Sequence, residues 1–303
     1  MKRLLLALFA LAPIVPCAGC SVVLSPGEEQ CEAVTDCSDR GFANAACVEG
    51  VCVDTATTAG VGGGGGEGGA VDPVWGCLGN VIEKEADPTK TLEISFRLAF
   101  ATSGEAVKTA VVDICDKLDI GCTGDSEDFP KGLTPDNTGI VTATVREGFD
   151  GFVRITSPEI VDSRVYVGRP IVELPKTKEI QLLSPMEYQF LAENVGGAEL
   201  DPTRGSAIML AIDCQGESAS GVRFETPGAD ADSLEFYLIN QSPTPPPAAT
   251  ATDVDGFGGY FNLKTAQTLG RAFREEDDVY IGESSFGVFA NTISYVQIGP
   301  TPE

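Results

Sequence analysis

Cysteine is the residue type with the most chemical potential in this sequence. Eight cysteines follow residue 20: Cys31, Cys37, Cys47, Cys52, Cys77, Cys115, Cys122 and Cys214. An even number of cysteines in an exported chain is typical of disulfides. Zinc is the alternative, but the first four have the spacing C-x5-C-x9-C-x4-C, without the close C-x2-C pairs that zinc favours. We therefore expect all eight to form disulfides.

Loop length bears on the pairing of the last four cysteines. Cys115 and Cys122 enclose six turn-prone residues, a loop short enough to close locally. We expect this bridge, which leaves Cys77 to pair with Cys214. The alternative, Cys77–Cys115 with Cys122–Cys214, remains open at this point.

Acidic residues are the second group that could do chemistry, by binding calcium. The turn D-V-D-G at 253–256 does not fit an EF-hand loop, because Gly256 falls at position 4 and Lys264 at position 12, where that loop needs Gly at 6 and Glu at 12. A looser site is conceivable in the acid-rich stretch 113–128, although such acids are more often simply solvated. We therefore predict no metal and no cofactor. The acids of that stretch are Asp113, Asp116, Asp119, Asp125, Glu127 and Asp128.

Groups suited to catalysis are scarce. The chain has no histidine, which removes Ser-His-Asp and Cys-His catalysis and the commonest general base near neutral pH. The serine-nucleophile patterns S-x-x-K and G-x-S-x-G do not occur. A carboxylate pair, as in glycosidases, is the remaining option, and 45 acids bring some pairs close by chance. We predict that the protein is not an enzyme.

The first twenty residues, MKRLLLALFALAPIVPCAGC, indicate export. Two cations precede an apolar stretch of about twelve residues, too short to span a bilayer as a mature helix. The ending C-A-G-C resembles the lipobox of bacterial lipoproteins, although Cys17 stands where that family usually has Leu. The resemblance implies a signal peptide over 1–19 and a lipid on Cys20; because Ser21 follows, it implies the outer membrane, facing periplasm or cell surface. An ordinary cleaved signal peptide is the alternative.

The charge of the mature chain limits its partners. Without residues 1–19, 18 Lys and Arg stand against 45 Asp and Glu, a net charge of −27. Such a surface repels phosphate backbones and anionic lipid headgroups. We therefore expect no nucleic-acid partner, and a membrane attachment through the lipid anchor alone.

Two small segments follow a tether at 20–30. Residues 31–53 hold four cysteines in too short a piece for a hydrophobic core, and residues 54–73 form a Gly-rich flexible linker. From the residues alone, three pairings of these four cysteines are possible. The ending C-V-E-G-V-C resembles small cysteine-rich, EGF-like or Dickkopf-like modules, and that resemblance implies Cys31–Cys47 and Cys37–Cys52.

From residue 74 onward, short alternating apolar runs predict strands. A helix separates two sets of them; it begins with Ser184 as N-cap and Pro185 in the first turn, and ends at Gly196. The predicted strands are 91–101, 106–114, 139–145, 151–156, 164–169 and 179–184 in the first set, and 206–213, 221–226, 233–239, 259–263, 279–283 and 292–298 in the second.

The two strand sets match one another at offsets of 113 to 118 residues, which indicates an internal repeat. The match puts Gly139 and Gly256 at equivalent hairpin bends, and each copy is long enough for a seven-strand sandwich. The matching segments are 134–139 with 252–256, 165–168 with 279–282, and 180–182 with 296–298.

The turn T-D-V-D-G, followed by an aromatic strand and Asn-Leu, resembles the carboxypeptidase regulatory-like, transthyretin-like domains. That resemblance implies a Greek-key β-sandwich and no particular activity. The expected fold class is mainly β, with a disulfide-rich knob and a Gly-rich linker before two tandem Greek-key β-sandwiches. The sandwiches are expected at 74–185 and 206–303, joined by one short helix and a connector at 186–205.

Two functions fit these features. The first is a lipid-anchored, non-enzymatic cell-envelope protein that displays β-sandwiches for binding or adhesion, with an unknown protein or polysaccharide as partner. The alternative is a carbohydrate-binding or hydrolase-accessory lipoprotein with an exposed platform of aromatic rings. Candidates for that platform are Tyr166, Tyr237, Tyr260 and Tyr280, although core or cross-strand packing is the favoured interpretation of each ring. Trp75 is expected to plug the entrance of the first sandwich.

Overall fold

The computed structural model describes residues 45–48, 51–54, 74–124, 126–173, 178–195, 199–240 and 242–302. The chain divides into two compact units, Met1–Gly69 and Ala70–Glu303. In the first unit, β1 (Ala45–Val48) and β2 (Val51–Asp54) form an antiparallel pair that sets Cys47 opposite Cys52. The predicted signal peptide, lipid site, tether and linker, and the pairing of the first four cysteines, lie outside the described residues.

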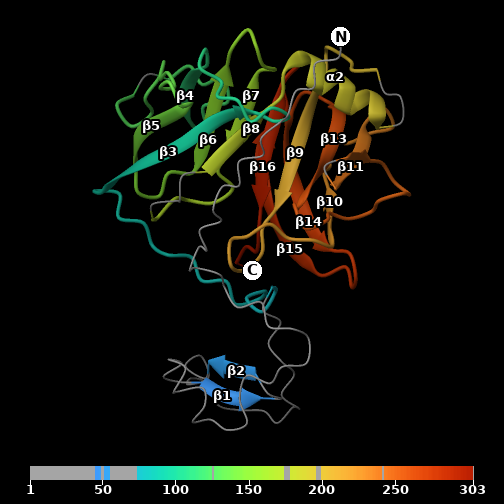
Figure 1. Ribbon diagram of the computed structural model, residues 1–303. Coiled ribbons are helices and arrows are strands. Elements are labelled where there is room, and N and C mark those ends of the chain that lie inside the picture. The colour runs from blue at the N-terminus through green and yellow to red at the C-terminus, as the bar shows by residue number, and fades with distance from the viewer. Residues whose placement is uncertain are drawn as a thin grey trace, which may run out of the picture. The chain divides into compact units, whose positions relative to one another are not determined.

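The second unit is built almost entirely of strands, which confirms the predicted mainly-β class (Figure 1). Its described part has one helix, α2 (Pro185–Asn194). The strands are β3 (Thr91–Phe100), β4 (Val111–Asp116), β5 (Ile140–Arg146), β6 (Gly151–Thr156), β7 (Ser163–Tyr166), β8 (Lys178–Leu182), β9 (Gly205–Ala211), β10 (Val222–Glu225), β11 (Leu234–Ile239), β12 (Ser242–Thr244), β13 (Phe257–Leu263), β14 (Gln267–Arg274), β15 (Tyr280–Gly287) and β16 (Ile293–Ile298).

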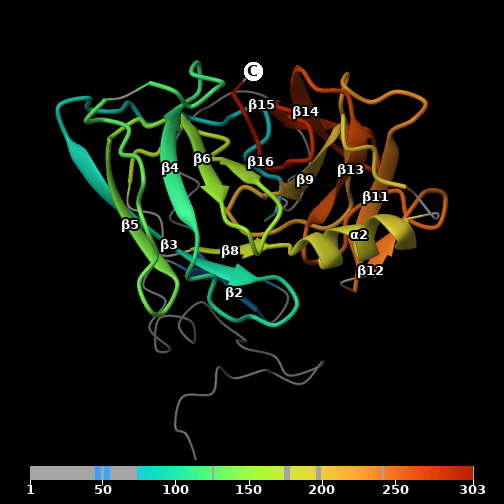
Figure 2. The ribbon, with the colours of Figure 1, turned by 90° about the horizontal axis from the view of Figure 1, so that it is seen from above.

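These strands form three sheets arranged as two sandwiches that lie side by side (Figure 2). One sheet has eight strands in the order β12-β11-β13-β9-β16-β7-β6-β4. Its β7-β6-β4 end packs with the sheet β5-β3-β8 around one buried cluster, and its other end packs with β10-β14-β15 around another.

The two sandwiches repeat one strand plan. In the first, β3 lies between antiparallel β5 and parallel β8; in the second, β9 lies between antiparallel β13 and parallel β16. The antiparallel order β4-β6-β7 likewise corresponds to β10-β14-β15. The second copy adds the β11–β12 hairpin beside β13.

The two matched glycines occupy equivalent bends. Gly139 and Gly256 precede β5 and β13, with φ of +86° and +75°. The carbonyl of Gly139 accepts from the Leu98 amide and that of Gly256 from the Ala211 amide, each at 2.8 Å. The expectation of equivalent bends is therefore confirmed, but neither bend is a hairpin, because β4 and β5 lie in different sheets and β12 does not pair with β13.

One predicted match is shifted. β8 and β16 are equivalent strands, as the repeat predicted. The register fixed by the two glycine bends, however, aligns Ile180, the partner of Leu98, with Ile298, the partner of Ala211. The sequence match of Ile180 with Val296 was therefore wrong by two residues, a slip that leaves every side chain on its own face of the strand.

The two sandwiches share a sheet rather than standing apart as separate tandem domains. β16, the last strand of the second copy, pairs in parallel with β7 of the first. The β7-β6-β4 end is also buried on both faces: Val153 packs into the first core, while its neighbour Phe152 packs with Tyr166 into the second. Residues 70–303 therefore form one body.

α2 begins as the sequence predicted. The Glu187 amide donates to the Ser184 hydroxyl at 3.3 Å, and the Ser184 amide donates to the Glu187 carboxylate at 2.6 Å, which makes a capping box. The helix ends at Asn194; the predicted end, Gly196, lies outside the described residues. No helix in the part of the chain that the structure describes is long and apolar enough to cross a membrane.

Candidate functional site

The acid-rich stretch 113–128 uses its carboxylates locally. Asp113 pairs with Arg154 at 2.9 Å, Asp119 accepts from the Gly124 amide at 2.6 Å, and Asp128 pairs with Arg146 at 2.6 Å. Among the described residues, which leave out Asp125, no group of three or more potential ligands is placed to hold a metal ion. The carboxylates named here therefore cap a turn or form ion pairs.

The D-V-D-G turn is a structural bend. The Asp253 carboxylate accepts from the Asp255 amide at 3.0 Å and from the Asn240 amide at 2.6 Å. Asp136, at the equivalent place in the first copy, accepts from the amides of Thr138 and Ile140. These bonds hold each turn closed before β5 or β13.

The platform of aromatic rings that the alternative function needs is not formed. Tyr166, Tyr237 and Tyr260 are 5%, 0% and 7% exposed, and only Tyr280, at 40%, reaches solvent. The apolar faces of the three buried rings are needed in the core, where Tyr166 stacks on Phe152 with ring centres 5.2 Å apart. Core packing, the favoured interpretation of these rings, is therefore confirmed for Tyr166, Tyr237 and Tyr260, and the carbohydrate-accessory alternative loses its stated support.

Trp75 is also a core residue. It is 8% exposed and belongs to the same buried cluster as Cys115, Cys122 and Tyr166. That cluster extends into the second sandwich, so the ring covers the junction of the two copies rather than the entrance of the first alone.

Both disulfides that the structure describes have the pairing expected from the sequence. Cys77 and Cys214 are joined with Cα atoms 5.8 Å apart, and Cys115 and Cys122 with Cα atoms 5.2 Å apart. The first bridge ties the segment before β3 to the end of β9, and hence one copy to the other. The second closes the loop after β4.

Two side chains reinforce the junction between the copies. The Gly287 amide donates to the Tyr166 hydroxyl at 2.9 Å. The guanidinium of Arg164, on β7, lies 3.4 Å from the centre of the Phe289 ring and donates to the Ile120 carbonyl. Burial lowers the pKa of Arg164 from its ordinary value. Sequence reasoning missed this role, although a cation inside the strand pattern R-V-Y-V-G-R is a signal of it.

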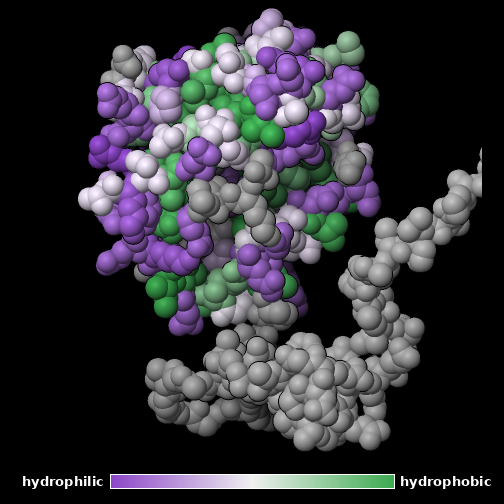
Figure 3. Space-filling model, turned by 60° about the vertical axis from the view of Figure 1, so that its left-hand side comes forward, coloured by the Kyte–Doolittle hydropathy of each residue, from purple (hydrophilic) through white to green (hydrophobic). Residues whose placement is uncertain are grey.

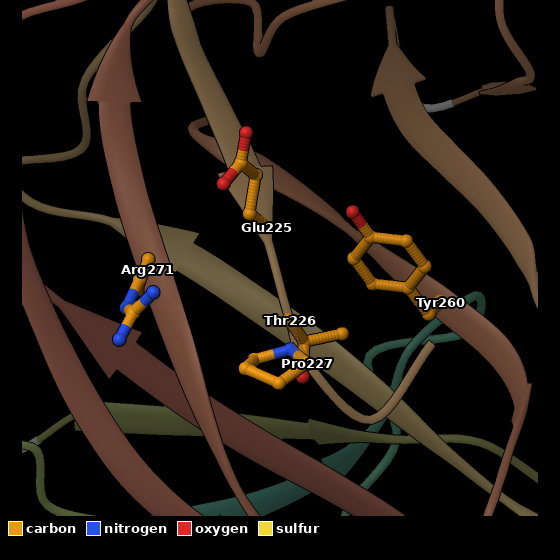
Figure 4. Close-up of a pocket in the computed structure, with 5 residues that line it drawn as sticks. All are labelled: Glu225, Thr226, Pro227, Tyr260 and Arg271. Atoms are coloured by element: carbon orange, nitrogen blue, oxygen red, sulfur yellow. The ribbon is translucent and has the colours of Figure 1, made fainter. Parts of the chain in front are cut away.

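A small polar pocket of about 280 Å³ lies beside β10, β13 and β14 (Figure 4). Its side chains already bond to protein groups: the Tyr260 hydroxyl donates to the Phe224 carbonyl at 2.8 Å, and Arg271 pairs with Glu283 at 3.2 Å. Glu225 pairs with Arg223 and Thr226 with Thr268. Ligand pockets generally offer about 300–1,000 Å³, so this one has room for a small polar group at most. Its lining is Glu225, Thr226, Pro227, Tyr260 and Arg271.

A larger, open depression of about 690 Å³ lies at the end of β3, and we call it the β3 groove. Arg97 is fixed in its wall, donating to the carbonyls of Gly104 at 2.8 Å and Thr138 at 3.3 Å and pairing with Glu179. Cations, carboxylates and hydroxyls stand together here, a surface suited to a polar chain such as a peptide or a saccharide. The lining is Arg97, Phe100, Glu105, Ala106, Lys108, Thr109, Asn137, Thr138 and Glu159.

Hydrogen bonds lower the pKa of several carboxyl groups of the described residues. Every resolved pKa shift among them is downward; a hydrogen bond from Thr138 lowers the pKa of Asp136, and one from the Gly124 amide lowers that of Asp119. A general acid working near neutral pH needs a raised pKa.

No family model matches the chain, and no curated protein matches it. Solved structures similar to it include the Bacillus anthracis TIE protein, with a TM-score of 0.24 and 10% identity over 70% of this chain. The chain spans about a third (34%) of that protein's length. Another is BcpA, the major pilin subunit of Bacillus cereus, with a TM-score of 0.23, 13% identity and 70% of each chain covered. Shaft pilin SpaA from Lactobacillus rhamnosus GG has a TM-score of 0.21 and 11% identity, over 71% of this chain and 99% of its own. At these TM-scores the likenesses carry no argument about function.

Proposed function

We propose that the protein is a lipid-anchored, non-enzymatic component of the cell envelope that displays its two fused β-sandwiches for binding or adhesion. The anchor is the lipid on Cys20 that the N-terminal sequence implies, and the outer membrane is the proposed location. The partner is a protein or a polysaccharide.

The observation that carries this proposal is the rigidity of the second unit. β7 and β16 pair across the junction, the β7-β6-β4 end is buried on both faces, and a disulfide closes a separation of 137 residues between Cys77 and Cys214. A body held this firmly presents a surface whose shape is fixed before a partner arrives, which lowers the entropy cost of binding.

The β3 groove is the proposed contact surface. It is the larger of the two depressions described above, and its wall is held by bonds from Arg97 to backbone carbonyls. Lys108 and Glu159 bring opposite charges to its rim, together with the hydroxyl of Thr109. Such a mixed rim suits polar ligands whose own donors and acceptors replace water.

Membrane fractionation of the Cys20→Ala variant tests the anchor. We expect the variant to leave the membrane fraction and to lose partitioning into detergent, because no acyl chains remain to hold it. Cys17→Ala is the matched control, since Cys17 lies in the same segment and should not carry the lipid. Unchanged membrane association of the Cys20→Ala protein would contradict the proposed lipid anchor.

Capture from outer membranes tests the binding role. The wild-type lipidated protein should retain a partner that a Lys108→Glu variant retains less well. Lys84→Glu is the control, because Lys84 is an exposed cation that pairs with Glu173 rather than lining the groove. Equal capture by both variants and wild type would remove the groove from the proposal.

A further inference from the structure

Three polar side chains that line the β3 groove are left for a ligand. Glu105, Lys108 and Asn137 are exposed, and no hydrogen bond or ion pair engages their side chains among the described residues. A carboxylate only accepts hydrogen bonds, an ammonium only donates them, and a carboxamide does both. A ligand that fits all three must therefore donate and accept within a short stretch.

The side chains around these three are held in place. The Thr109 hydroxyl donates to the Glu159 carboxylate and lies 2.7 Å from the Ser157 hydroxyl. Together with the bonds that fix Arg97, these contacts give the groove a wall whose form is set before a ligand enters. A wall ordered in advance lowers the entropy cost of binding.

A peptide backbone finds no strand edge in the groove. β3 pairs with β5 on one side and with β8 on the other, so it has no free edge for a further strand. Beyond β3, the Phe100 amide donates to the Glu105 carbonyl and the Val107 amide to the Leu98 carbonyl. The groove therefore offers its ligand side chains rather than a backbone ladder.

The groove also lacks the apolar centre that a protein partner would need. Its apolar lining is limited to Phe100 and Ala106, and both are already partly buried. Protein interfaces gain most of their free energy from aromatic and apolar anchors in well-packed pockets. Figure 3 shows the side of the second unit that carries β3, β4 and β5; hydrophilic residues prevail there, with hydrophobic areas between them.

Charge narrows the class of ligand further. Arg97 is paired with Glu179, which leaves one positive charge on Lys108 and two negative charges on Glu105 and Glu159 in the lining. The mature chain as a whole carries a net charge of −27. A polyanionic chain is repelled by such a surface, so the groove suits a ligand without charge.

Hydroxyl groups meet these requirements, because each one both donates and accepts. We propose that the β3 groove binds a neutral polysaccharide, whose hydroxyls donate to Glu105 and Glu159 and accept from Lys108 and Asn137. The exposed part of the Phe100 ring packs on the apolar C–H face of a sugar ring. The volume of about 690 Å³ falls within the 300–1,000 Å³ of ligand sites. This inference rests on the proposed function and chooses polysaccharide over protein as the partner.

Isothermal titration calorimetry tests the inference, with the whole mature chain carrying Cys20→Ser for solubility. The probes are neutral hexasaccharides of glucose, of mannose and of N-acetylglucosamine, with hexagalacturonate as the anionic comparison. We expect at least one neutral probe to bind with a dissociation constant of about 1 mM or tighter. Hexagalacturonate should bind more weakly, because the protein repels it.

Three variants locate the site. Glu105→Ala, Lys108→Ala and Asn137→Ala should each weaken binding about fivefold, because each removes one hydrogen bond to the sugar. Their thermal unfolding should match the reference, since these exposed side chains have no partners to lose. Lys84→Ala is the control, because Lys84 is an exposed cation that pairs with Glu173 outside the groove, and it should bind like the reference.

The possible failures separate this inference from the proposed function. If no neutral probe binds while capture from outer membranes still depends on Lys108, the polysaccharide is wrong and the proposed function stands. If capture is lost as well as saccharide binding, both are wrong. Binding that all three variants leave unchanged would overturn the groove as the site, and hexagalacturonate binding as tightly as the neutral probes would overturn the neutral class.

Discussion

Gly256 is the residue whose replacement tests the D-V-D-G turn most directly. Its φ is +75°, and a Cβ built there would lie 2.9 Å from the Ala211 carbonyl oxygen. A branched side chain would both strain the backbone and press on β9. We expect Gly256→Val to lower the free energy of unfolding by roughly 1–3 kcal/mol, measured by urea denaturation.

Gly216→Val is the matched control for that measurement. Gly216 also has a positive φ, +83°, but a Cβ there would meet nothing within 4 Å. The control therefore isolates the backbone strain from the contact with β9. Equal losses in the two variants would show that the close approach at Gly256 does not matter.

The buried tyrosines make a second prediction at this scale. Burial raises the pKa of Tyr166, Tyr188, Tyr237, Tyr260 and Tyr295. The unfolded chain ionises its phenols near pH 10, so the stability from these groups is complete below that pH and is lost as pH rises above it. We expect phenolate absorbance and loss of circular dichroism to rise together in one cooperative step at alkaline pH.

Tyr280 provides the internal comparison: burial raises its pKa too, but it is the most exposed of the described tyrosines and can ionise without unfolding. A Tyr280→Phe variant should lose the early, non-cooperative part of the titration and keep the step. A gradual titration of all phenols with the fold intact would contradict the burial described for them.

At the scale of elements, alternation of apolar residues predicted most of the strands. Alternation predicts a strand correctly where one face of the strand is buried. In β5, for example, Val141, Ala143 and Val145 face the core while Thr142 and Thr144 face solvent. The helix was found from Ser184 and Pro185, because a capping residue followed by proline is a local signal. Both signals are carried by consecutive residues, so no tertiary knowledge is needed to read them.

β14 was missed for a physical reason. Its buried positions are Gly270 and Ala272, and the position between them carries arginine. Small residues give no hydrophobic periodicity, yet they fit here because a Cβ at Gly270 would lie 2.8 Å from Ile298 and 3.3 Å from Met209. The opposing sheet leaves room only for small side chains at these positions. The sequence of β14 alone does not reveal that constraint.

The candidate sites were harder to predict than the strands. An aromatic residue in an alternating strand could face either way, and for Tyr166 and Tyr237 the phenol ends were buried with backbone partners, at Gly287 and Phe224. The β3 groove joins residues from four separate stretches between Arg97 and Glu159. The groove forms only when those stretches pack together, so no local sequence pattern could have predicted it.

At the scale of the whole molecule, the two sandwiches were expected as separate tandem domains, and the structure joins them through a shared sheet. The sequence repeat predicted the two copies, and the short Cys115–Cys122 loop left Cys77 to bridge to Cys214, but neither predicted the parallel pairing of β16 with β7. When two strands far apart in the sequence pair in parallel, neither strand's sequence identifies its partner; each shows only a run of apolar residues. A sheet shared by both copies should make them unfold together.

The two disulfides test how that body is held. In the chain-entropy model a bridge over 137 residues stabilises by about 5 kcal/mol and one over 7 residues by about 2.5 kcal/mol. We expect the double variant Cys77→Ala with Cys214→Ala to lose about twice as much free energy of unfolding as Cys115→Ala with Cys122→Ala. Urea denaturation under one set of conditions measures both.

The shape of the transition carries the stronger test. Because β7 and β16 still pair without the long bridge, and Phe152 and Tyr166 still pack into the second core, the Cys77→Ala, Cys214→Ala protein should unfold in a single step. Intrinsic fluorescence of Trp75, at the junction, and far-ultraviolet circular dichroism, from all the strands, should then follow the same curve. Two separate transitions would mean that the disulfide, and not the shared sheet, makes the copies one body.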